Sequence, residues 1–570
     1  MALLAALGGA LAGCGSSSPP GTSAEPARAV PASAVLYVGA TVRPTGAQKT
    51  SALAAGKAFT GQADPYLRLL AALQTPGSPQ LNFARDVAPW LGPHAGAFLT
   101  SLGSSSSALL SLLEQGLLGS ATSSAFPFSA TGAQGAIVLD TSDATKAQSF
   151  LNAQAKRAGA HASSYRGVSY QVSAGGVAFG IVDRFAVIGS ESGLRGVIET
   201  THGGGSLASA SGYSKLLAKA PSEALAHIYS NPTAGEASPA SGSQSSAVGE
   251  GLSSLIALLA GRHEANISLL TSAGTLALDA DTLSSPASSA SAQQSQGEGL
   301  LAADPQGAQA LAELPGESWL AIGLGHVGAG LAQDVQGLQD LGSLFSSPQE
   351  GTAGLSLSSV LKALITPLNA LAANTAQARH DFTSWMSSGG IFASGASLLE
   401  LKGAVVFSST NPAASRLAVS KLADQLRAAG ASVSPAKIAG TEAAMAARVS
   451  GLPVVLDIAD GRGANGQAKF VLGIGEASVG AALNPPSALA GSAPHDAAVA
   501  ALGEGTQPSL IVGVPTFLSL IEGLGLSEAP GISKFVPYLR SLTTLSGGGH
   551  SLGGDVERFR LVLGLAQAGG

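Results

Sequence analysis

The stretch YRGVSYQVSAGGVAFGIVDRFAVIG, residues 165–189, decides the fold class. It contains three runs rich in valine, isoleucine and aromatic residues, which favour β-strands, at 165–172, 176–182 and 184–189. The links between the runs are only a few residues long. Links this short join antiparallel neighbours, because a parallel crossover needs about a dozen residues or more. The sequence therefore predicts an α+β protein with a mainly antiparallel sheet, not a doubly wound α/β fold.

The same order of segments occurs twice along the 570 residues. Each half begins with a proline-led strand, reaches a D-x-x-x-W motif, and continues with a strand and a long helix that ends at glycine. Further strands with short helices between them close each half. Seven matches in one order predict two tandem homologous halves, each a mainly antiparallel sheet with packed helices. The matched segments are 31–39 and 315–323, 86–90 and 381–385, 135–138 and 403–406, 156–160 and 427–431, 184–189 and 469–475, 224–229 and 509–514, and 275–281 and 558–563.

A segment rich in serine, alanine and glutamine separates the halves. Residues 284–302, SSPASSASAQQSQGEGLLA, have the composition of a linker. The first repeat is therefore predicted to span 30–283 and the second 303–568. The first repeat also contains a leucine-rich insert around 108–118. The spacing from Trp90 to Gly135 is 45 positions, whereas the spacing from Trp385 to Gly403 is 18.

The N-terminus predicts export and lipid attachment. Cys14 is the single cysteine of the chain, which excludes an internal disulfide. It follows an apolar run, 2–12, that is too short to span a bilayer but has the length of a signal-peptide core. The sequence Leu11-Ala12-Gly13-Cys14 resembles the bacterial lipobox, which implies cleavage before Cys14 and acylation of its thiol. We therefore expect a signal peptide at 1–13, a flexible tether at 14–29, and an extracytoplasmic protein held to the membrane by lipid.

One segment resembles a known family. The run Phe83-Ala84-Arg85-Asp86-Val87-Ala88-Pro89-Trp90-Leu91-Gly92 resembles the D-x-x-P-W-L-G signature of the uncharacterised bacterial domain-of-unknown-function 3352 family. The opening strand with Arg43-Pro44 and the segment 185–195 are also similar to that family. The resemblance implies an exported or membrane-attached protein, and it implies no catalytic residue because no activity is established for the family. The second copy departs from the signature at Ser384, Met386 and Ser387.

We interpret the signature as a structural motif. Pro89 fixes the approach to Trp90, whose indole is expected to fill a gap in the core. Gly92 is expected to turn the chain. Asp86 is expected either to accept a hydrogen bond from the indole N–H or to cap a turn. Asp381 and Trp385 are predicted to play the same parts in the second half.

No motif predicts a catalytic, cofactor or metal site. The G-x-G-x-x-G pattern at 323–328 lacks the following strand with an acidic tip that dinucleotide binding requires. The S-x-x-K patterns at 359–362 and 434–437 lack the partner motifs of acylating serine enzymes. We interpret His380-Asp381 and His495-Asp496 as exposed loop residues. Asp279 and Asp281, which alternate along a strand, are expected to lie on a solvated face.

Composition narrows the classes of function. Charged residues make up 11% of the chain, the net charge is −6, and the 29 lysines and arginines are dispersed, which argues against nucleic acid as a partner. We expect a non-enzymatic binding or scaffolding module of the cell envelope, without a cofactor, that attaches to the membrane through Cys14 and has an envelope protein or lipid as partner. Two alternatives are a carrier of an apolar ligand, in a groove between the halves or beneath the insert at 108–118, and a secreted hydrolase without a recognisable motif. The insert itself is interpreted as a lid over an apolar groove, a patch that lies on the membrane, or an extra helix packed on its own domain.

Overall fold

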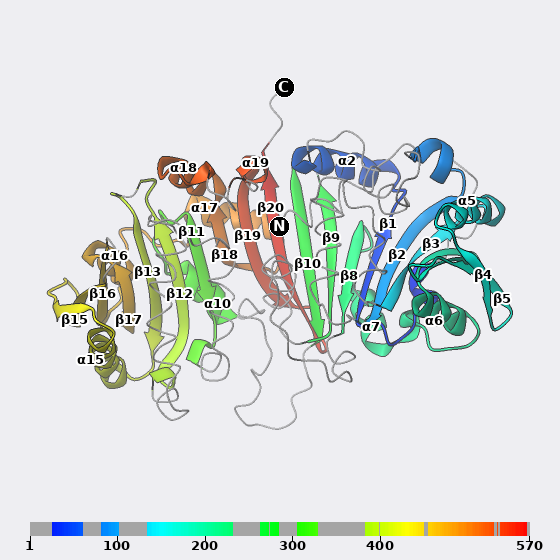
Figure 1. The fold of residues 1–570 in the computed structure, drawn as a ribbon. Coiled ribbons are helices and arrows are strands. Elements are labelled where there is room, and N and C mark those ends of the chain that lie inside the picture. The colour runs from blue at the N-terminus through cyan, green and yellow to red at the C-terminus, as the bar shows by residue number, and fades with distance from the viewer. Residues whose placement is uncertain are drawn as a thin grey trace. The chain divides into compact units, whose positions relative to one another are not determined.

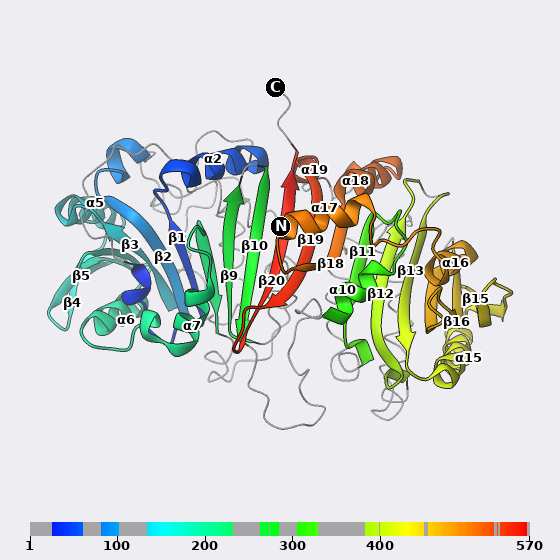
Figure 2. The ribbon, with the colours of Figure 1, turned by 180° about the vertical axis from the view of Figure 1, so that it is seen from behind.

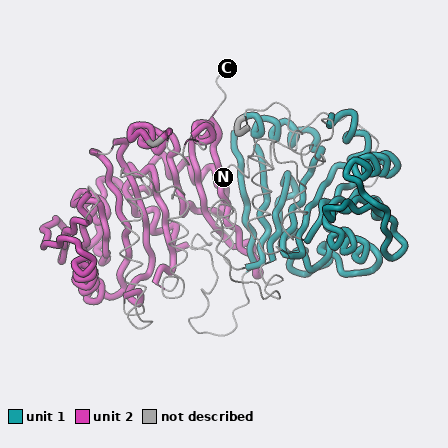
Figure 3. Tube along the Cα trace, viewed as in Figure 1, with its two compact units in different colours: residues 1–256, 262–284, 567–570 teal, residues 257–261, 285–566 magenta. Residues whose placement is uncertain are grey.

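The computed structural model, seen from two sides in Figure 1 and Figure 2, divides into two compact units. Unit 1 comprises residues 1–256, 262–284 and 567–570, and unit 2 comprises residues 257–261 and 285–566 (Figure 3). The division at residue 284 falls where the predicted linker begins. The residues that the structure describes are 25–60, 81–101, 134–231, 263–272, 274–283, 305–328, 382–397, 399–449, 454–528, 533 and 536–566.

Unit 1 contains one antiparallel sheet of ten strands. The order across the sheet is β4-β5-β6-β7-β3-β2-β1-β8-β9-β10, so the first strand lies inside the sheet. The strands are β1 (Leu36–Thr41), β2 (Leu91–Ser101), β3 (Gln134–Thr141), β4 (His161–Tyr165), β5 (Val168–Val172), β6 (Val177–Val182), β7 (Phe185–Ser190), β8 (Ala226–Ser230), β9 (Ala265–Ser272) and β10 (Thr275–Leu283). The helices are η1 (Pro26–Arg28), α2 (Gly46–Thr60), the π-helical turn η2 (Phe83–Val87), α5 (Ala144–Arg157), α6 (Glu191–Thr201), η3 (Leu207–Ser209) and α7 (Ser211–Lys219).

Unit 2 contains a second antiparallel sheet of ten strands. Its order is β14-β15-β16-β17-β13-β12-β11-β18-β19-β20. The strands are β11 (Leu320–Leu324), β12 (Met386–Ser394), β13 (Lys402–Ser409), β14 (Ser432–Pro435), β15 (Thr441–Arg448), β16 (Val455–Arg462), β17 (Ala468–Ile474), β18 (Gln507–Gly513), β19 (Leu542–Ser551) and β20 (Val556–Leu565). The helices are α10 (Pro305–Ala312), α15 (Pro412–Ala428), α16 (Glu476–Leu483), α17 (Ala493–Leu502), α18 (Val514–Gly523), η4 (Leu526–Glu528) and α19 (Val536–Leu539).

The predicted α+β class with a mainly antiparallel sheet is confirmed. Every strand pairing within each unit is antiparallel, and the two sheets have the same strand order when β1 to β10 are replaced by β11 to β20. One predicted strand is corrected. The run 165–172 contains a turn at Arg166 and Gly167, which have φ values of 47° and 84° and separate β4 from β5.

Helices cover both faces of the sheet at its β4–β7 end. Successive residues of a strand point to opposite faces. Tyr170 Oη donates to Glu191 of α6, whereas the Gln171 side chain donates to Asn152 of α5, so α6 and α5 lie on opposite faces. In unit 2, α10 lies across β11 and β12, as Figure 2 shows.

The long helix of each unit begins and ends as its sequence predicts. Asp143 accepts a hydrogen bond from the Lys146 backbone N–H at 3.0 Å and is the N-cap of α5. Asn411 accepts from the Ala414 backbone N–H at 3.2 Å and is the N-cap of α15, whose first residue is proline. Glycines 159 and 430, at φ 62° and 90°, follow the two helices because a left-handed residue ends a helix readily.

The folded chain begins earlier than the predicted tether allows. Residues 26–28, assigned to the tether, form the 3-10 helix η1, and Ala27 and Ala29 are fully buried. The backbone of Val30 then accepts a hydrogen bond from the Leu207 N–H at 2.7 Å. The described chain is thus fastened to unit 1 from its first residues.

Candidate functional site

The D-x-x-x-W motif of unit 1 forms a tight turn in front of β2. Asn82 Oδ1 accepts from the Arg85 backbone N–H at 3.0 Å, and the Asp86 carboxylate accepts from the Asn82 backbone N–H at 2.8 Å. The Arg85 guanidinium donates to the same carboxylate at 2.7 Å and is the main cause that lowers the pKa of Asp86. Of the two roles that the sequence left open for this carboxylate, it therefore caps the turn.

Trp90 is held in the core by neutral contacts. Its side chain is buried, and its Nε1 donates to the backbone oxygen of Asp86 at 2.8 Å. The indole lies 5.2 Å from the ring of Phe150 on α5. The Trp90 backbone oxygen accepts from the Ser142 N–H at 2.8 Å, just before α5 begins. The motif thus joins the start of β2 to the start of the long helix.

Trp385 has the corresponding position in unit 2. It is buried, its ring lies 5.5 Å from that of Phe470, and its backbone oxygen accepts from the Thr410 N–H at 2.8 Å. Within the described residues Trp385 Nε1 has no hydrogen-bond partner. Asp381, the first residue of this copy of the motif, lies outside the described residues.

Gly92 leaves room for a buried carboxylate. It lies inside β2, so the prediction that it turns the chain is wrong. A Cβ added at Gly92 would lie 2.3 Å from Asp140 Oδ2. Asp140 is fully buried, and its Oδ1 is bound by Arg184 NH2 at 2.9 Å and Nε at 3.0 Å. An open hollow of about 530 Å³ adjoins this ion pair and is lined by Arg28, Asp183, Arg184, Phe185, Thr200 and Thr201.

Unit 2 changes both partners of this contact. In the matched segments, Ser387 stands where unit 1 has Gly92, and Ser408 stands where it has Asp140. Ser387 Oγ donates to the backbone oxygen of Ser408 at 3.2 Å. The smaller serine at 408 leaves space for a side chain at 387. The two units thus have different residue pairs at these matched positions, glycine with aspartate in unit 1 and serine with serine in unit 2.

A cluster of three tyrosines and one histidine, Tyr37, Tyr213, Tyr229 and His227, lies on one face of the unit 1 sheet. We call it the Tyr–His cluster. In the register of β1 and β8, Tyr37 is opposite Tyr229. Helix α7 places Tyr213 over them, with ring centroids 5.9 Å from Tyr37 and 5.1 Å from Tyr229. Tyr213 Oη lies 3.0 Å from His227 Nε2.

Two carboxylates complete the cluster. Tyr213 Oη donates to Glu25 Oε1 at 3.1 Å, and Tyr229 Oη donates to Glu264 Oε1. Because the single phenol proton of Tyr213 is directed to Glu25, the His227 Nε2 carries a proton and donates to Tyr213. The hydrogen bonds therefore run from His227 through Tyr213 to Glu25, the residue in front of η1.

Burial keeps the cluster neutral apart from its carboxylates. Burial lowers the pKa of His227 to about 4, with a smaller contribution from His94. Burial also raises the pKa of Tyr213 and Tyr37 well above the usual range, and nearby charges add to the shift. At neutral pH the imidazole is uncharged and the phenols are protonated. No phenolate nucleophile is present in the cluster at that pH.

Unit 2 has an apolar core at the equivalent place. Ala321 aligns with Tyr37 and is opposite Ile511, which is where unit 1 has Tyr229. The predicted match of 224–229 with 509–514 is therefore wrong by three residues, since it would place Val514, the first residue of α18, at this position. A Cβ added at Gly323 would lie 1.9 Å from the backbone oxygen of Gly307 in α10. In unit 1 the matched Gly39 faces the ring of His227 instead, at 2.5 Å from an added Cβ. The two units thus fill the same space with different chemistry.

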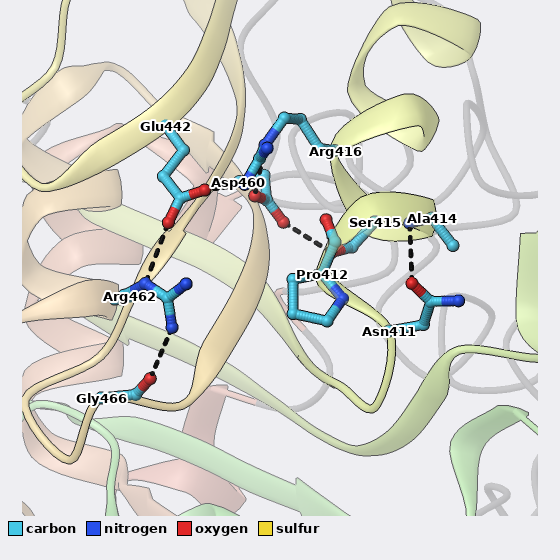
Figure 4. Close-up of polar contacts among 9 residues, drawn as sticks. All are labelled: Asn411, Pro412, Ala414, Ser415, Arg416, Glu442, Asp460, Arg462 and Gly466. Carbon is cyan, nitrogen blue, oxygen red and sulfur yellow. Dashed lines mark hydrogen bonds and ion pairs between the residues drawn. The ribbon is translucent and has the colours of Figure 1, made fainter.

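A second polar network ties α15 to the sheet of unit 2 (Figure 4). Glu442 binds Arg416 through one oxygen and Arg462 through the other, the latter at 2.9 Å. Ser415 Oγ donates to the buried Asp460 at 2.6 Å. Burial raises the pKa of Asp460, and the hydrogen bond from Ser415 opposes that change. The charges of the two arginines balance those of the two carboxylates. The network therefore joins α15 to β15 and β16 without a net charge.

Two of the three predictions about acidic and histidine side chains are tested by the described residues. Asp279 and Asp281 are fully buried, so the expectation of a solvated face is wrong. They lie on β10 in the same register rows as the Tyr–His cluster, and α7 packs over that end of the sheet. His495 lies in the first turn of α17 rather than in a loop, with Nδ1 3.7 Å from Asp496. His380 lies outside the described residues.

The sequence alone did not predict the Tyr–His cluster. Its signal is weak: Tyr37 and Gly39, and His227 and Tyr229, are two residues apart on their strands and therefore share a face. Cys14, the insert at 108–118 and the linker at 284–302 lie outside the described residues. In the part of the chain that the structure describes, no group of three or more His, Cys, Asp or Glu side chains is placed to hold a metal ion. No described helix is both long and apolar enough to cross a membrane.

The fold and these sites define an α+β protein whose two units share one strand order and carry different buried polar groups. The chain belongs to the family described as "Protein of unknown function (DUF3352)", which matches residues 1–544. No curated protein and no solved structure is significantly similar to the chain.

Proposed function

We propose that the chain is a lipid-anchored binding or scaffolding module of the cell envelope, built from two copies of one ancestral α+β unit. The lipobox at Cys14 supports the anchor. The single observation that carries a non-enzymatic role is the Tyr–His cluster. It gathers the residue types of an active site, yet they are buried, bonded to one another and held in their neutral forms.

The descent of both units from one ancestor rests on matched backbone contacts as well as on strand order. Leu207 N donates to Val30 O at 2.7 Å in unit 1, and Leu489 N donates to Leu314 O at 2.7 Å in unit 2. The Ser142–Trp90 and Thr410–Trp385 backbone hydrogen bonds, both 2.8 Å long, match in the same way. Chance similarity of composition does not produce equal contacts at equal places in two sheets.

The anchor is tested by Cys14→Ser. We expect the wild-type protein in the membrane fraction, with acyl groups on Cys14 in intact-mass spectra, and the variant in the soluble fraction. Cys14→Ser combined with Ser17→Cys is the matched control, because it restores a thiol without restoring the lipobox. Full membrane association of Cys14→Ser, or restored acylation in the control, contradicts the anchor.

The binding role is tested on the purified full chain. Native mass spectrometry is expected to show protein without bound lipid, and serine-reactive probes are expected to label no residue stoichiometrically. Cross-linking in intact cells is expected to join the anchored protein reproducibly to an envelope component. Co-purifying lipid would contradict this proposal and support a carrier of an apolar ligand. Stoichiometric labelling of one serine would contradict it and support a hydrolase.

A further inference from the structure

The chain entering unit 1 is fastened by one side-chain contact near its start. Glu25, directly in front of η1, accepts a hydrogen bond from the hydroxyl of Tyr213, which lies 188 positions further along the chain. Tyr213 in turn contacts His227 on β8. The remaining fastening is the burial of Ala27, Ala29 and Val30 and backbone pairing, Leu207 N to Val30 O at 2.7 Å and Ala32 N to Gly205 O at 2.9 Å.

We propose that Glu25, Tyr213 and His227 form an acid-sensitive latch that fastens residues 25–34 to unit 1 at neutral pH and releases them as the pH falls. The latch exists in the folded chain whether or not Cys14 is acylated. Its consequence for the membrane tether, which lengthens when the latch opens, rests on the proposed anchor.

Burial supplies the acid sensitivity. A charged imidazole at His227 would sit among the buried rings of Tyr37, Tyr213 and Tyr229, which offer it no negative charge. The titratable groups facing His227 are Tyr37 from β1, His94 from β2, Tyr213 from α7, Tyr229 from β8 and Glu25 from the start of η1. Glu264 reaches the cluster through Tyr229, and Asp279 lies in the same register row beyond Ser268.

Acid acts on the latch through His227, the buried group whose pKa is lowered. His227 has a lowered pKa in the fold, so its contribution to the latch is complete above its ordinary pKa and is lost as the pH falls toward 4. If opening exposes His227, the opening equilibrium rises about 20-fold between pH 7 and pH 5.

Unit 2 contains a control for this proposal. Its matched segment is fastened by the same backbone pairing, Leu489 N to Leu314 O at 2.7 Å and Gly316 N to Ser487 O at 2.8 Å. The positions in register with Tyr37 and Tyr229 are Ala321 and Ile511. The third residue of α17, which matches Tyr213 of α7, is His495, and it lies beside the Asp496 carboxylate instead of among buried tyrosine rings. Acid should therefore affect residues 27–34 and leave the matching residues 311–318 unaffected.

Hydrogen exchange of the full chain, read by mass spectrometry at pH 7 and pH 5 and corrected for intrinsic exchange rates, tests the latch. In the wild type we expect protection of residues 27–34 to fall about 20-fold and that of the matching residues 311–318 to change less than threefold. His227→Gln, which keeps a donor for Tyr213, should abolish the fall. An equal fall in both segments, or an undiminished fall in His227→Gln, overturns the proposal.

A second variant keeps the test independent of how His227→Gln folds. Tyr213→Phe retains the ring and removes the hydroxyl that joins Glu25 to His227. We expect it to lower the protection of 27–34 at pH 7 by about tenfold or more, since one hydrogen bond to a charged group is lost. Wild-type protection at pH 7 in Tyr213→Phe refutes the latch. This readout does not involve the membrane, so it succeeds or fails separately from the Cys14→Ser experiment.

Discussion

Replacing Gly92 with serine is expected to destabilise unit 1 by about 3 kcal/mol or more. The added Cβ would lie 2.3 Å from Asp140 Oδ2 and 2.6 Å from its Cγ, far inside an ordinary contact. Asp140 has a short side chain that is fully buried and bound twice by Arg184, so it cannot move aside without breaking those bonds. A buried carboxylate that loses its partner then accounts for most of the free energy lost.

The matched positions of unit 2, Ser387 and Ser408, suggest a second substitution that should offset the first. Asp140→Ser alone removes the buried charge and leaves Arg184, whose side chain is 37% exposed, to water; we expect a loss of about 1–2 kcal/mol. In the double variant Gly92→Ser/Asp140→Ser the added side chain meets a smaller neighbour, as at Ser387 and Ser408. The double variant should be about as stable as Asp140→Ser, which gives a coupling energy of about 3 kcal/mol.

Urea unfolding followed by tryptophan fluorescence measures these differences. The chain has three tryptophans, and replacing Trp319 and Trp385 with phenylalanine leaves Trp90, two residues from the substitution, as the reporter of unit 1. Gly205→Ser is the control, since its nearest neighbour would be 3.7 Å from the added Cβ and its stability should change by less than about 0.5 kcal/mol. A loss below about 1 kcal/mol for Gly92→Ser, or additivity in the double variant, refutes the argument.

Three further predictions concern unit stability. The pKa of Asp460 is raised in the fold, so its contribution to stability is present at low pH and is lost as the pH rises through the folded-state pKa. The wild type should therefore lose stability relative to Asp460→Asn between acid and neutral pH. Parallel pH profiles of the two proteins in urea unfolding would contradict this. Asp143→Ala and Asn411→Ala should each lower the free energy of unfolding by about 1 kcal/mol through loss of an N-cap, and unequal losses beyond about 1 kcal/mol would show that the caps are not equivalent. Gly323→Ala places a Cβ 1.9 Å from a backbone oxygen of α10 and should cost about 1–3 kcal/mol, whereas Gly480→Ala meets no atom within 4 Å and should not destabilise; thermal unfolding of the two variants compares them.

Local chemistry made the fold class and the helix ends predictable. Short links between β-rich runs admit only antiparallel pairing, and that rule holds for every link between β4 and β7. Asp143 and Asn411 cap helices because the side-chain oxygen of each accepts a hydrogen bond from a free backbone N–H three residues later. The two partners are close in sequence, so the cap can be recognised from the local sequence. Such signals need no knowledge of the tertiary structure.

Contacts between distant residues were not predictable in the same way. Tyr37, Tyr213 and Glu25 meet only because β1 pairs with β8 and α7 crosses the same face. Gly92 has the local sequence of a turn, and the buried Asp140 that requires a glycine there is 48 residues away. Asp279 looks like an exposed strand residue until the helix over its face is known. Polar groups in a core carry no sequence signal beyond their own identity.

The position of β1 inside its sheet affects how the chain folds. Tyr37 pairs with Phe98 on one side and with Tyr229 on the other, so one edge of β1 stays open until most of unit 1 has been synthesised. Pairings between residues so far apart in sequence slow folding, because the entropic cost of closing a long loop precedes the stabilising contacts. A nascent chain of this kind remains unfolded for longer than one with local pairings. Under the proposed export, that delay would keep the chain unfolded while it crosses the membrane.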